Sequence, residues 1–176
     1  MSSARARVLD TATRLFYAEG IHTVGVDRVI AEAGVAKATF YHHFKSKEEL
    51  VLAYLTAEYG RQREVLEGLS GTGVDRIETI LVKLAELSAG PGFRGCPFLN
   101  AAAEFADPAH PVRHLVDDYR AWYRTLMQDI LAAAGRPDAD RKADLLLLIR
   151  DGVAVAGGLG DQDAVQAGVR AGLAAV

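Results

Sequence analysis

The chain has 176 residues, a net charge of −3, a hydrophobic fraction of one half and a single cysteine. This composition suits one domain of ordinary size, or a small unit attached to a larger one, with a substantial hydrophobic core. The net charge argues against a protein coated with nucleic acid, and a single cysteine cannot form a disulfide within the chain. A membrane span needs about 20 apolar residues, and the apolar run at 145–149 is far shorter. We therefore expect a cytoplasmic protein without membrane contact.

Apolar residues recur at helical spacing in the first third of the chain. A first helix is predicted to end at Gly20, a second to cover residues 26–33, and a short third to cover 37–44. Ser46 and Glu49 have the spacing of a capping box, in which each side chain accepts the other residue's free backbone N–H. This pattern predicts a fourth helix from Ser46 to about residue 69.

The rest of the chain shows the same helical period and no strand-like alternation. Breaks rich in Gly and Pro separate the apolar stripes, and Asp138 and Asp161 are predicted to cap the last two helices. The further predicted helices cover residues 74–87, 97–105, 112–131, 138–155 and 161–175. The sequence thus predicts an all-α fold of about nine helices.

The segment GVAKATFYHHFKSKEEL, residues 34–50, concentrates aromatic and basic side chains just after a glycine. The first three predicted helices have the order and lengths of a helix–turn–helix unit, whose second motif helix lies in the major groove of DNA. Phe40 and Phe44 are four residues apart and are predicted to hold this short helix to the first two. The opposite face would then present Lys37, Thr39, Tyr41 and His42 to DNA. Residues 1–50 carry seven Lys and Arg against six Asp and Glu, a weak positive bias.

The stretch GVDRVIAEAGVAKATFYHHFKSKEELVLAYL closely resembles the DNA-binding segment of the TetR/AcrR family of bacterial transcription regulators, over about residues 7–55. GCPFLNAAAEFADPAHPVR is similar to a stretch in one branch of that family. The resemblance implies a homodimeric repressor that binds a palindromic operator and is released by a small ligand. It divides the chain into a DNA-binding domain at 1–46, with the motif at about 25–44, and a helical ligand-binding and dimerisation domain at 47–176.

Two residues depart from the family pattern. Ala36 stands where a Ser or Thr helix cap is common, and Ala38 stands where Gly is common. Lys47 stands where the family's lysine contacts a phosphate. Thr23 and Arg28, around the start of the second helix, are weaker phosphate candidates. The predicted DNA-contacting residues are Thr23, Arg28, Lys37, Ala38, Thr39, Tyr41, His42, Lys45 and Lys47. The alternative for the lysines is a solvated basic face.

A regulator core must hold an effector, and such pockets are mostly apolar with a few polar groups. We expect a small apolar or amphipathic effector and no cofactor. The pocket candidates are Phe93, Cys96, Phe98, Asn100, Glu104, His114, Tyr119, Trp122, Tyr123 and Met127. For the aromatic residues, the alternative is a place in the core.

Cys96 has two interpretations. A thiol near Arg94 and the helix start at Pro97 could be an oxidant or electrophile sensor, because both features lower a thiol pKa; otherwise Cys96 is a small apolar filler. His110 and His114 have a metal-pair spacing, but Pro111 is expected to place His110 outside the helix and no four-ligand set is complete. We therefore predict no metal site.

The apolar stretch LLLLIRDGVAVAGGLG is predicted to be buried against a second subunit in a dimeric four-helix bundle. The predicted interface residues are Leu146, Ile149, Val153, Gly157, Val165, Val169 and Leu173. The alternative is a helix buried within the monomer.

The main functional alternatives share this fold: an activator or ligand-independent regulator, or a regulator that senses through Cys96. Two rivals lie outside it. A Cys96–His enzyme lacks a complete nucleophile–base–orienter set, and a protein-binding adaptor does not explain the cluster of lysines.

Overall fold

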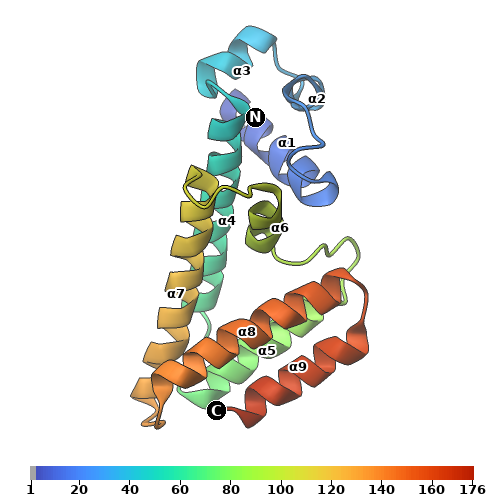
Figure 1. Ribbon diagram of the computed structural model, residues 1–176. Helices are drawn as coiled ribbons and strands as arrows, with labels where there is room; N and C mark the ends of the chain where they lie inside the picture. The colour runs from blue at the N-terminus through green and yellow to red at the C-terminus, as the bar shows by residue number, and fades with distance from the viewer. Residues whose placement is uncertain (1–2) are drawn as a thin grey trace.

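The computed structural model describes residues 3–176, so the first two residues of the expected 1–46 unit lie outside the described residues. Over this range the secondary structure consists of nine helices and contains no strand. The all-α prediction is thus confirmed. Figure 1 shows α1–α3 at one end of the molecule and α5, α8 and α9 at the other.

The N-terminal unit consists of α1 (Ala4–Glu19), α2 (Val26–Ala33) and α3 (Lys37–His43). Gly20 follows α1 with a φ of 94°, and Gly34 follows α2 with a φ of 61°, both in the region that favours glycine. The N–H of Val35 bonds to the carbonyl of Ile30, and the N–H of Gly34 to that of Ala31. These two bonds form a Schellman turn, and α2 ends at Ala33, where its sequence predicts.

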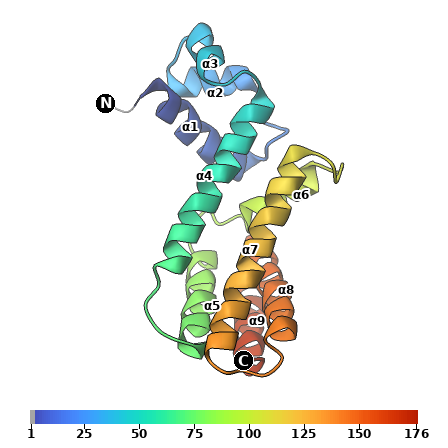
Figure 2. The same ribbon diagram turned by 90° about the vertical axis from the view of Figure 1, so that its left-hand side faces the viewer.

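The body begins with α4 (Lys47–Glu67), which leaves the N-terminal unit and runs beside α7 (Pro111–Ala133) (Figure 2). Ser46 Oγ accepts the N–H of Glu49 at 3.0 Å, which confirms half of the capping box. The other half differs, because the Glu49 carboxylate accepts the N–H of Lys45 at 2.7 Å. The cap thereby ties the end of the N-terminal unit to the start of α4.

The remaining helices are α5 (Val74–Ser88), α6 (Pro97–Glu104), α8 (Ala139–Gly158) and α9 (Gln162–Ala174). Asp161 caps α9 as predicted, accepting the N–H of Ala164 at 2.9 Å. Asp138 precedes α8, but its backbone is left-handed and its side chain makes no capping bond, so that predicted cap is wrong. The helix also continues three residues beyond Val155.

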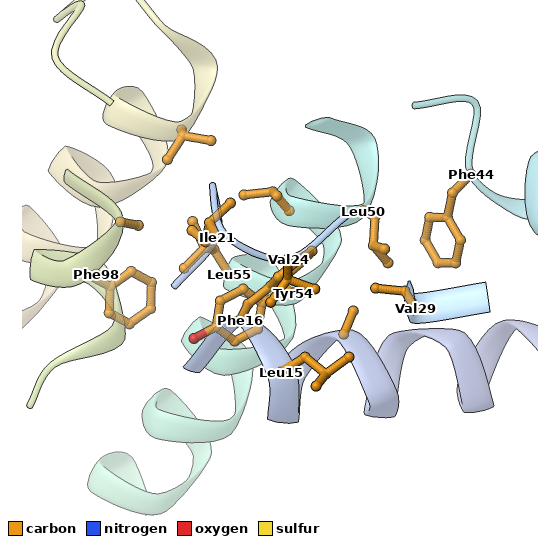
Figure 3. Close-up of a cluster of buried hydrophobic side chains, with 14 of the residues drawn as sticks. Leu15, Phe16, Ile21, Val24, Val29, Phe44, Leu50, Tyr54, Leu55 and Phe98 are labelled. Atoms are coloured by element: carbon orange, nitrogen blue, oxygen red, sulfur yellow. The ribbon is translucent and has the colours of Figure 1, made fainter. Parts of the chain in front are cut away.

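The core has two parts. The first joins the N-terminal unit to α4, α6 and the adjoining part of α7, and Figure 3 shows it from Phe44 beside α3 to Phe98 on α6. The second lies between α5, α7, α8 and α9. Because the first part crosses from the N-terminal unit into the body, apolar packing holds the two together without an intervening linker.

Glycines let α8 and α9 pack closely within the monomer. A Cβ on Gly157 would lie 2.5 Å from Ser88 Cβ, and one on Gly172 would lie 2.7 Å from Leu81 Cδ1. One on Gly168 would lie 2.5 Å from Val153 Cγ2. The small residues of this region therefore serve packing inside the chain.

Candidate nucleic-acid interface

The short helix α3 has a buried side and an exposed side, as its sequence predicts. Phe40 is fully buried and Phe44, just after the helix, is 1% exposed. Their ring centroids lie 6.0 Å apart. Tyr41 is 42% exposed on the other side, with its ring edge-on to Phe40 at 5.1 Å. The two phenylalanines thus form a platform that directs Tyr41 outward.

The exposed residues of this side include Lys37, Ala38, Tyr41 and His42, and Thr39 is half-buried. Ala36 provides no side-chain cap, so α3 begins as predicted. The Lys37 ammonium lies 3.1 Å from an Asp27 carboxylate oxygen, which raises the pKa of Lys37. Both side chains are solvent-exposed, so the pair is weak and a DNA phosphate can compete with Asp27 for the lysine.

Two lysines near the end of α3 contact backbone carbonyls. Lys45 Nζ donates to the carbonyl oxygens of Tyr41 and His42, at 3.2 and 3.4 Å. Lys47 is half-buried and its Nζ lies 3.5 Å from the carbonyl oxygen of His22; burial lowers the pKa of Lys47, while nearby Glu104 opposes that effect. Lys45 therefore lies on the candidate DNA surface, whereas Lys47 lies beside the α1–α2 loop.

Thr23 and Arg28, the weaker phosphate candidates, differ in whether their side chains are free to contact a phosphate. Thr23 is exposed in the α1–α2 loop. The Arg28 guanidinium is held by two carboxylates, with Nη1 2.5 Å from Glu19 and Nε 2.9 Å from Glu32. Its hydrogen bonds to Glu19 and Glu32 raise the pKa of Arg28. Arg28 thus connects α1 with α2, and contacting a phosphate would require it to exchange one of these partners.

A cleft of about 860 Å³ lies between the N-terminal unit and the body. Thr13, Arg14 and Tyr17 of α1 line it, together with residues of α4, α5, α7 and α8. Four of the ten predicted pocket residues are in its lining: Phe93, Cys96, Tyr119 and Tyr123.

The other six predicted pocket residues are not among those that line this cleft. Phe98 and Met127 are fully buried in the two cores. His114 is exposed on α7. The remaining three have polar partners elsewhere. Trp122 Nε1 lies 3.2 Å from Glu67, and Glu104 binds the α1–α2 loop. Asn100 donates to the Arg94 carbonyl at 2.8 Å and lines a smaller hollow of about 330 Å³.

Glu104 and Tyr17 connect the N-terminal unit to the body. The Glu104 carboxylate accepts the backbone N–H groups of Ile21 and His22, at 2.8 and 2.5 Å. The Tyr17 hydroxyl donates to the Gly95 carbonyl at 3.0 Å and accepts the Arg94 N–H at 2.9 Å. Burial raises the pKa of Tyr17, so its hydroxyl stays protonated as a donor. Tyr17 also lines the cleft, so cleft and connection share a residue.

Cys96 is 4% exposed and precedes Pro97 at the start of α6. Its basic neighbour is not the predicted Arg94 but Arg150, whose Nη2 lies 3.0 Å from Cys96 Sγ. Sequence reasoning missed Arg150 altogether. Its position inside the apolar run LLLLIRDG was an available signal, because a charged residue in a buried helix needs a specific partner.

The two histidines considered as a metal pair have separate surroundings. His110 lies outside α7, as Pro111 predicts, and its Nδ1 accepts the N–H of Val112 at 3.2 Å. Its Nε2 lies 3.7 Å from Glu48. Across residues 3–176, no group of three or more His, Cys, Asp or Glu side chains is arranged to hold a metal ion.

The predicted dimer residues mostly face the monomer core, and this prediction is corrected. Leu146, Val153, Gly157, Val165 and Val169 are buried within the chain, and Ile149 and Leu173 are half-buried. The exposed apolar residues of α8 occupy a neighbouring stripe, which we call the α8 stripe: Leu145, Leu148, Gly152, Val155 and Leu159. Their steps of three and four place them along one side of the helix. The five buried residues are therefore occupied within the monomer, and the exposed apolar side of α8 is the α8 stripe.

Comparison with known proteins agrees with this arrangement. A family model of bacterial regulatory proteins of the tetR family matches residues 8–54, and one of the tetracyclin repressor-like C-terminal domain matches residues 73–169. A TetR-family transcriptional regulator from Streptomyces coelicolor, known from a crystal structure, is 42% identical with a TM-score of 0.88, over 97% of this chain and 94% of that one.

Two curated relatives are more distant. The HTH-type transcriptional regulator LmrA of Bacillus subtilis is 29% identical over 126 residues, which are 68% of this chain and 66% of LmrA. The HTH-type transcriptional repressor NemR of Escherichia coli is 29% identical over 118 residues, 64% of this chain and 59% of NemR. The chain thus covers less than two thirds of the length of NemR and about two thirds of the length of LmrA.

The fold and the exposed α3 surface define a helix–turn–helix protein of the DNA-binding, regulatory class. The chain belongs to the TetR family of bacterial transcriptional regulators, which are not enzymes. The resemblance stated from the sequence is thereby confirmed. No helix within residues 3–176 combines the length and apolar character needed to cross a bilayer.

Proposed function

We propose that this protein is a ligand-responsive transcriptional repressor that binds a palindromic operator as a homodimer in the bacterial cytoplasm. One observation carries the ligand response: the cleft is lined both by α1 of the N-terminal unit and by the body. A molecule bound there would contact Tyr17, whose hydroxyl joins α1 to the backbone of Arg94 and Gly95. Occupancy would favour one orientation of the N-terminal unit over another.

The α8 stripe supports dimerisation. Leu148 is 65% exposed, Leu159 80% and Val155 51%, a run of large apolar side chains along one helix. One side of the neighbouring α9 exposes small residues at the same spacing, namely Ala164, Ala167, Ala171 and Ala174. Two helices per subunit would then form a four-helix bundle around a two-fold axis, with the leucines of one subunit against the alanines of the other. The same axis would pair two α3 helices on successive major grooves.

The dimer is tested by Leu148→Glu, which places a charge in the centre of the α8 stripe. We expect sedimentation velocity to show a dimer for the wild type and a monomer for this variant. The control is Val82→Glu on α5, where Val82 is 38% exposed but lies off the stripe. A Leu148→Glu variant that remains dimeric would remove the α8 stripe from the interface.

The direction of regulation is tested with a reporter gene placed behind DNA from the region flanking the protein's own gene. A repressor lowers reporter expression, and Tyr41→Ala restores it while the folded amount of protein stays the same. Raised expression would instead identify an activator, the first alternative. Unchanged expression with and without the protein would contradict regulation at that site.

One observation favours sensing through Cys96 as a second candidate. The thiol lies in the cleft lining, at a helix start, and receives a hydrogen bond from Arg150, so a small electrophile that enters the cleft would meet it. With N-ethylmaleimide, the sulfur would add to one alkene carbon and the other would take a proton from water. We expect mass spectrometry to show one adduct on the native wild type and none on Cys96→Ser. Only the wild type should then lose operator binding. A thiol that stays unmodified until the protein unfolds would exclude this candidate.

A further inference from the structure

Arg150 is the only charged side chain that is buried within residues 3–176, at 5% exposure. It extends from α8 into the cleft lining. Its Nη2 donates to the Tyr119 hydroxyl at 2.7 Å and to Cys96 Sγ, and its Nη1 lies 2.8 Å from Asp151. Its Cζ lies 5.2 and 5.5 Å from the ring centroids of Tyr119 and Tyr123. A guanidinium so placed is oriented by the protein.

The charges around Arg150 do not cancel. Asp151 is its carboxylate partner, but the same carboxylate also pairs with Arg120. Two guanidinium groups therefore share one carboxylate, and of the two only Arg150 is buried, because the Arg120 side chain is 28% exposed. A buried guanidinium that shares its carboxylate is incompletely neutralised, and an anion beside it lowers the free energy of the folded protein.

The lining of the cleft contains more cations than carboxylates, although the chain has a net charge of −3. Its charged lining residues are the cations Arg14, Arg61, Lys83 and Arg150 and the carboxylates Glu58 and Glu86. Arg61 is paired with Glu58 at 2.7 Å, and Arg14 is paired with Glu32 at 2.5 Å. Lys83 and Glu86 have opposite charges, so Arg150 is the buried lining cation that an anionic ligand would meet.

The Tyr123 hydroxyl is a second, independent indication that the cleft binds a ligand. Its side chain is 2% exposed and lines the cleft beside Arg150. Within the described part of the chain, its hydroxyl has no hydrogen-bond partner. Burial raises the pKa of Tyr123 to about 12, although Arg150 opposes this, so the hydroxyl is a donor at neutral pH. Buried hydroxyls are nearly always satisfied, and an acceptor brought by a ligand would satisfy this one.

The rest of the lining is largely apolar and includes Leu66, Ile80, Leu84, Leu87 and Phe93. A cleft with apolar walls and a few oriented polar groups suits a small amphipathic molecule. Its volume of about 860 Å³ is within the range of small-molecule sites.

We propose that the cleft binds an organic carboxylate, with one carboxylate oxygen on the Arg150 guanidinium, the other on the Tyr123 hydroxyl, and the apolar body against α4 and α5. This names the chemical class of the effector, and as an effector assignment it rests on the proposed function. Bound there, the carboxylate supplies the missing negative charge and the missing acceptor at once. The Tyr119 hydroxyl, which accepts from Arg150 and donates to Gln62 of α4 at 2.7 Å, connects the site to the helix that enters the N-terminal unit.

The test is isothermal titration of the full chain with two matched pairs: 2-naphthoate against 2-naphthalenemethanol, and decanoate against 1-decanol. We expect at least one carboxylate to bind at least about tenfold more tightly than its alcohol, as a charge-assisted hydrogen bond allows. Equal affinities within both pairs, or no carboxylate binding at millimolar concentration, would overturn the proposal.

Tyr123→Phe removes only the hydroxyl and is expected to keep the melting temperature, whereas Arg150→Met changes a buried ion and must first be shown to fold by circular dichroism. We expect Tyr123→Phe to weaken carboxylate binding by about tenfold and to leave alcohol binding unchanged. Tyr59→Phe is the control, because Tyr59 lies on α4 outside the cleft lining. A Tyr123→Phe variant that binds carboxylates like the wild type would contradict the assigned contact.

Operator binding of the unliganded protein is measured on the same preparations. It distinguishes failure of the carboxylate site from failure of the proposed regulatory function. A protein that binds its operator but no carboxylate would overturn this site and leave the regulator intact. A protein that binds carboxylates but no DNA would overturn the proposed function and leave the site.

Discussion

The two ends of the molecule achieve their arrangement in opposite ways. In the N-terminal unit, a helix of seven residues places its functional side chains in solvent, and two buried phenylalanines hold it in place. At the other end, α5, α8 and α9 pack so closely that glycines replace side chains at the contacts. The first end therefore depends on a small platform, whereas the second depends on the close spacing of helix backbones. Substitutions should affect them differently.

The largest effect is expected from Phe40→Ala, because Phe40 is the fully buried centre of the platform. Truncating a buried phenylalanine costs about 3–5 kcal/mol of unfolding free energy. Tyr41→Ala, one residue further on, should cost about 0.5 kcal/mol, since exposed substitutions have small effects. Urea unfolding of both variants checks this. Equal destabilisation would show that α3 does not have one buried and one exposed side.

A smaller loss is expected from Gly157→Ala in α8. The new Cβ would lie 2.5 Å from Ser88 Cβ, so the helices must separate, at about 1–3 kcal/mol. Gly60→Ala is the matched control, because Gly60 lies within α4 and a Cβ added there would have no neighbour within 4 Å. There the substitution should stabilise the protein by about 0.5–1 kcal/mol. Thermal unfolding that moves both variants in the same direction would contradict the close-packing account.

The connection between the two ends is expected to be weaker still. Glu104→Gln keeps one acceptor oxygen for the two N–H groups of Ile21 and His22, and should cost about 1–1.5 kcal/mol. Hydrogen exchange of these two amides should accelerate, whereas Glu64→Gln on the exposed surface of α4 should not change it. Unchanged protection in Glu104→Gln would mean that the carboxylate does not hold the loop.

The smallest effect is expected at the edge of the DNA surface. Lys45→Ala should leave stability nearly unchanged and weaken DNA binding by a similar factor for every operator sequence, as a phosphate contact does. The slope of log affinity against log salt concentration should fall by about one. Fluorescence anisotropy over a range of salt concentrations measures it. An unaltered slope would remove Lys45 from the phosphate contacts.

Local patterns made most of the fold predictable. The helix ends at Gly20 and Gly34, the cap at Ser46 and the two sides of α3 depend on residues within four positions of one another, so the sequence shows them directly. The predicted cap at Asp138 is wrong because the backbone there is left-handed, a conformation that Asp adopts more readily than most residues but that its N-cap pattern does not indicate.

The cleft and the α8 stripe were less predictable, because both depend on contacts between distant residues. Arg150 meets Cys96 from 54 positions away, so only tertiary packing brings the two together. On α8, apolar residues occur on more than one side of the helix. Periodicity gave the correct spacing, but only the packing against α5 and α9 shows that Leu146 is buried while Leu145 and Leu148 are exposed.

We propose that two copies of α3 in one dimer read DNA, and a selection from genomic fragments tests this most directly. Purified protein, shown to be a folded dimer, is mixed with fragments at low salt, and the bound duplexes are sequenced. We predict one enriched inverted repeat whose half-sites lie about one helical turn apart, and no enrichment by Tyr41→Ala. No enriched sequence, or one without two-fold symmetry, would contradict the account.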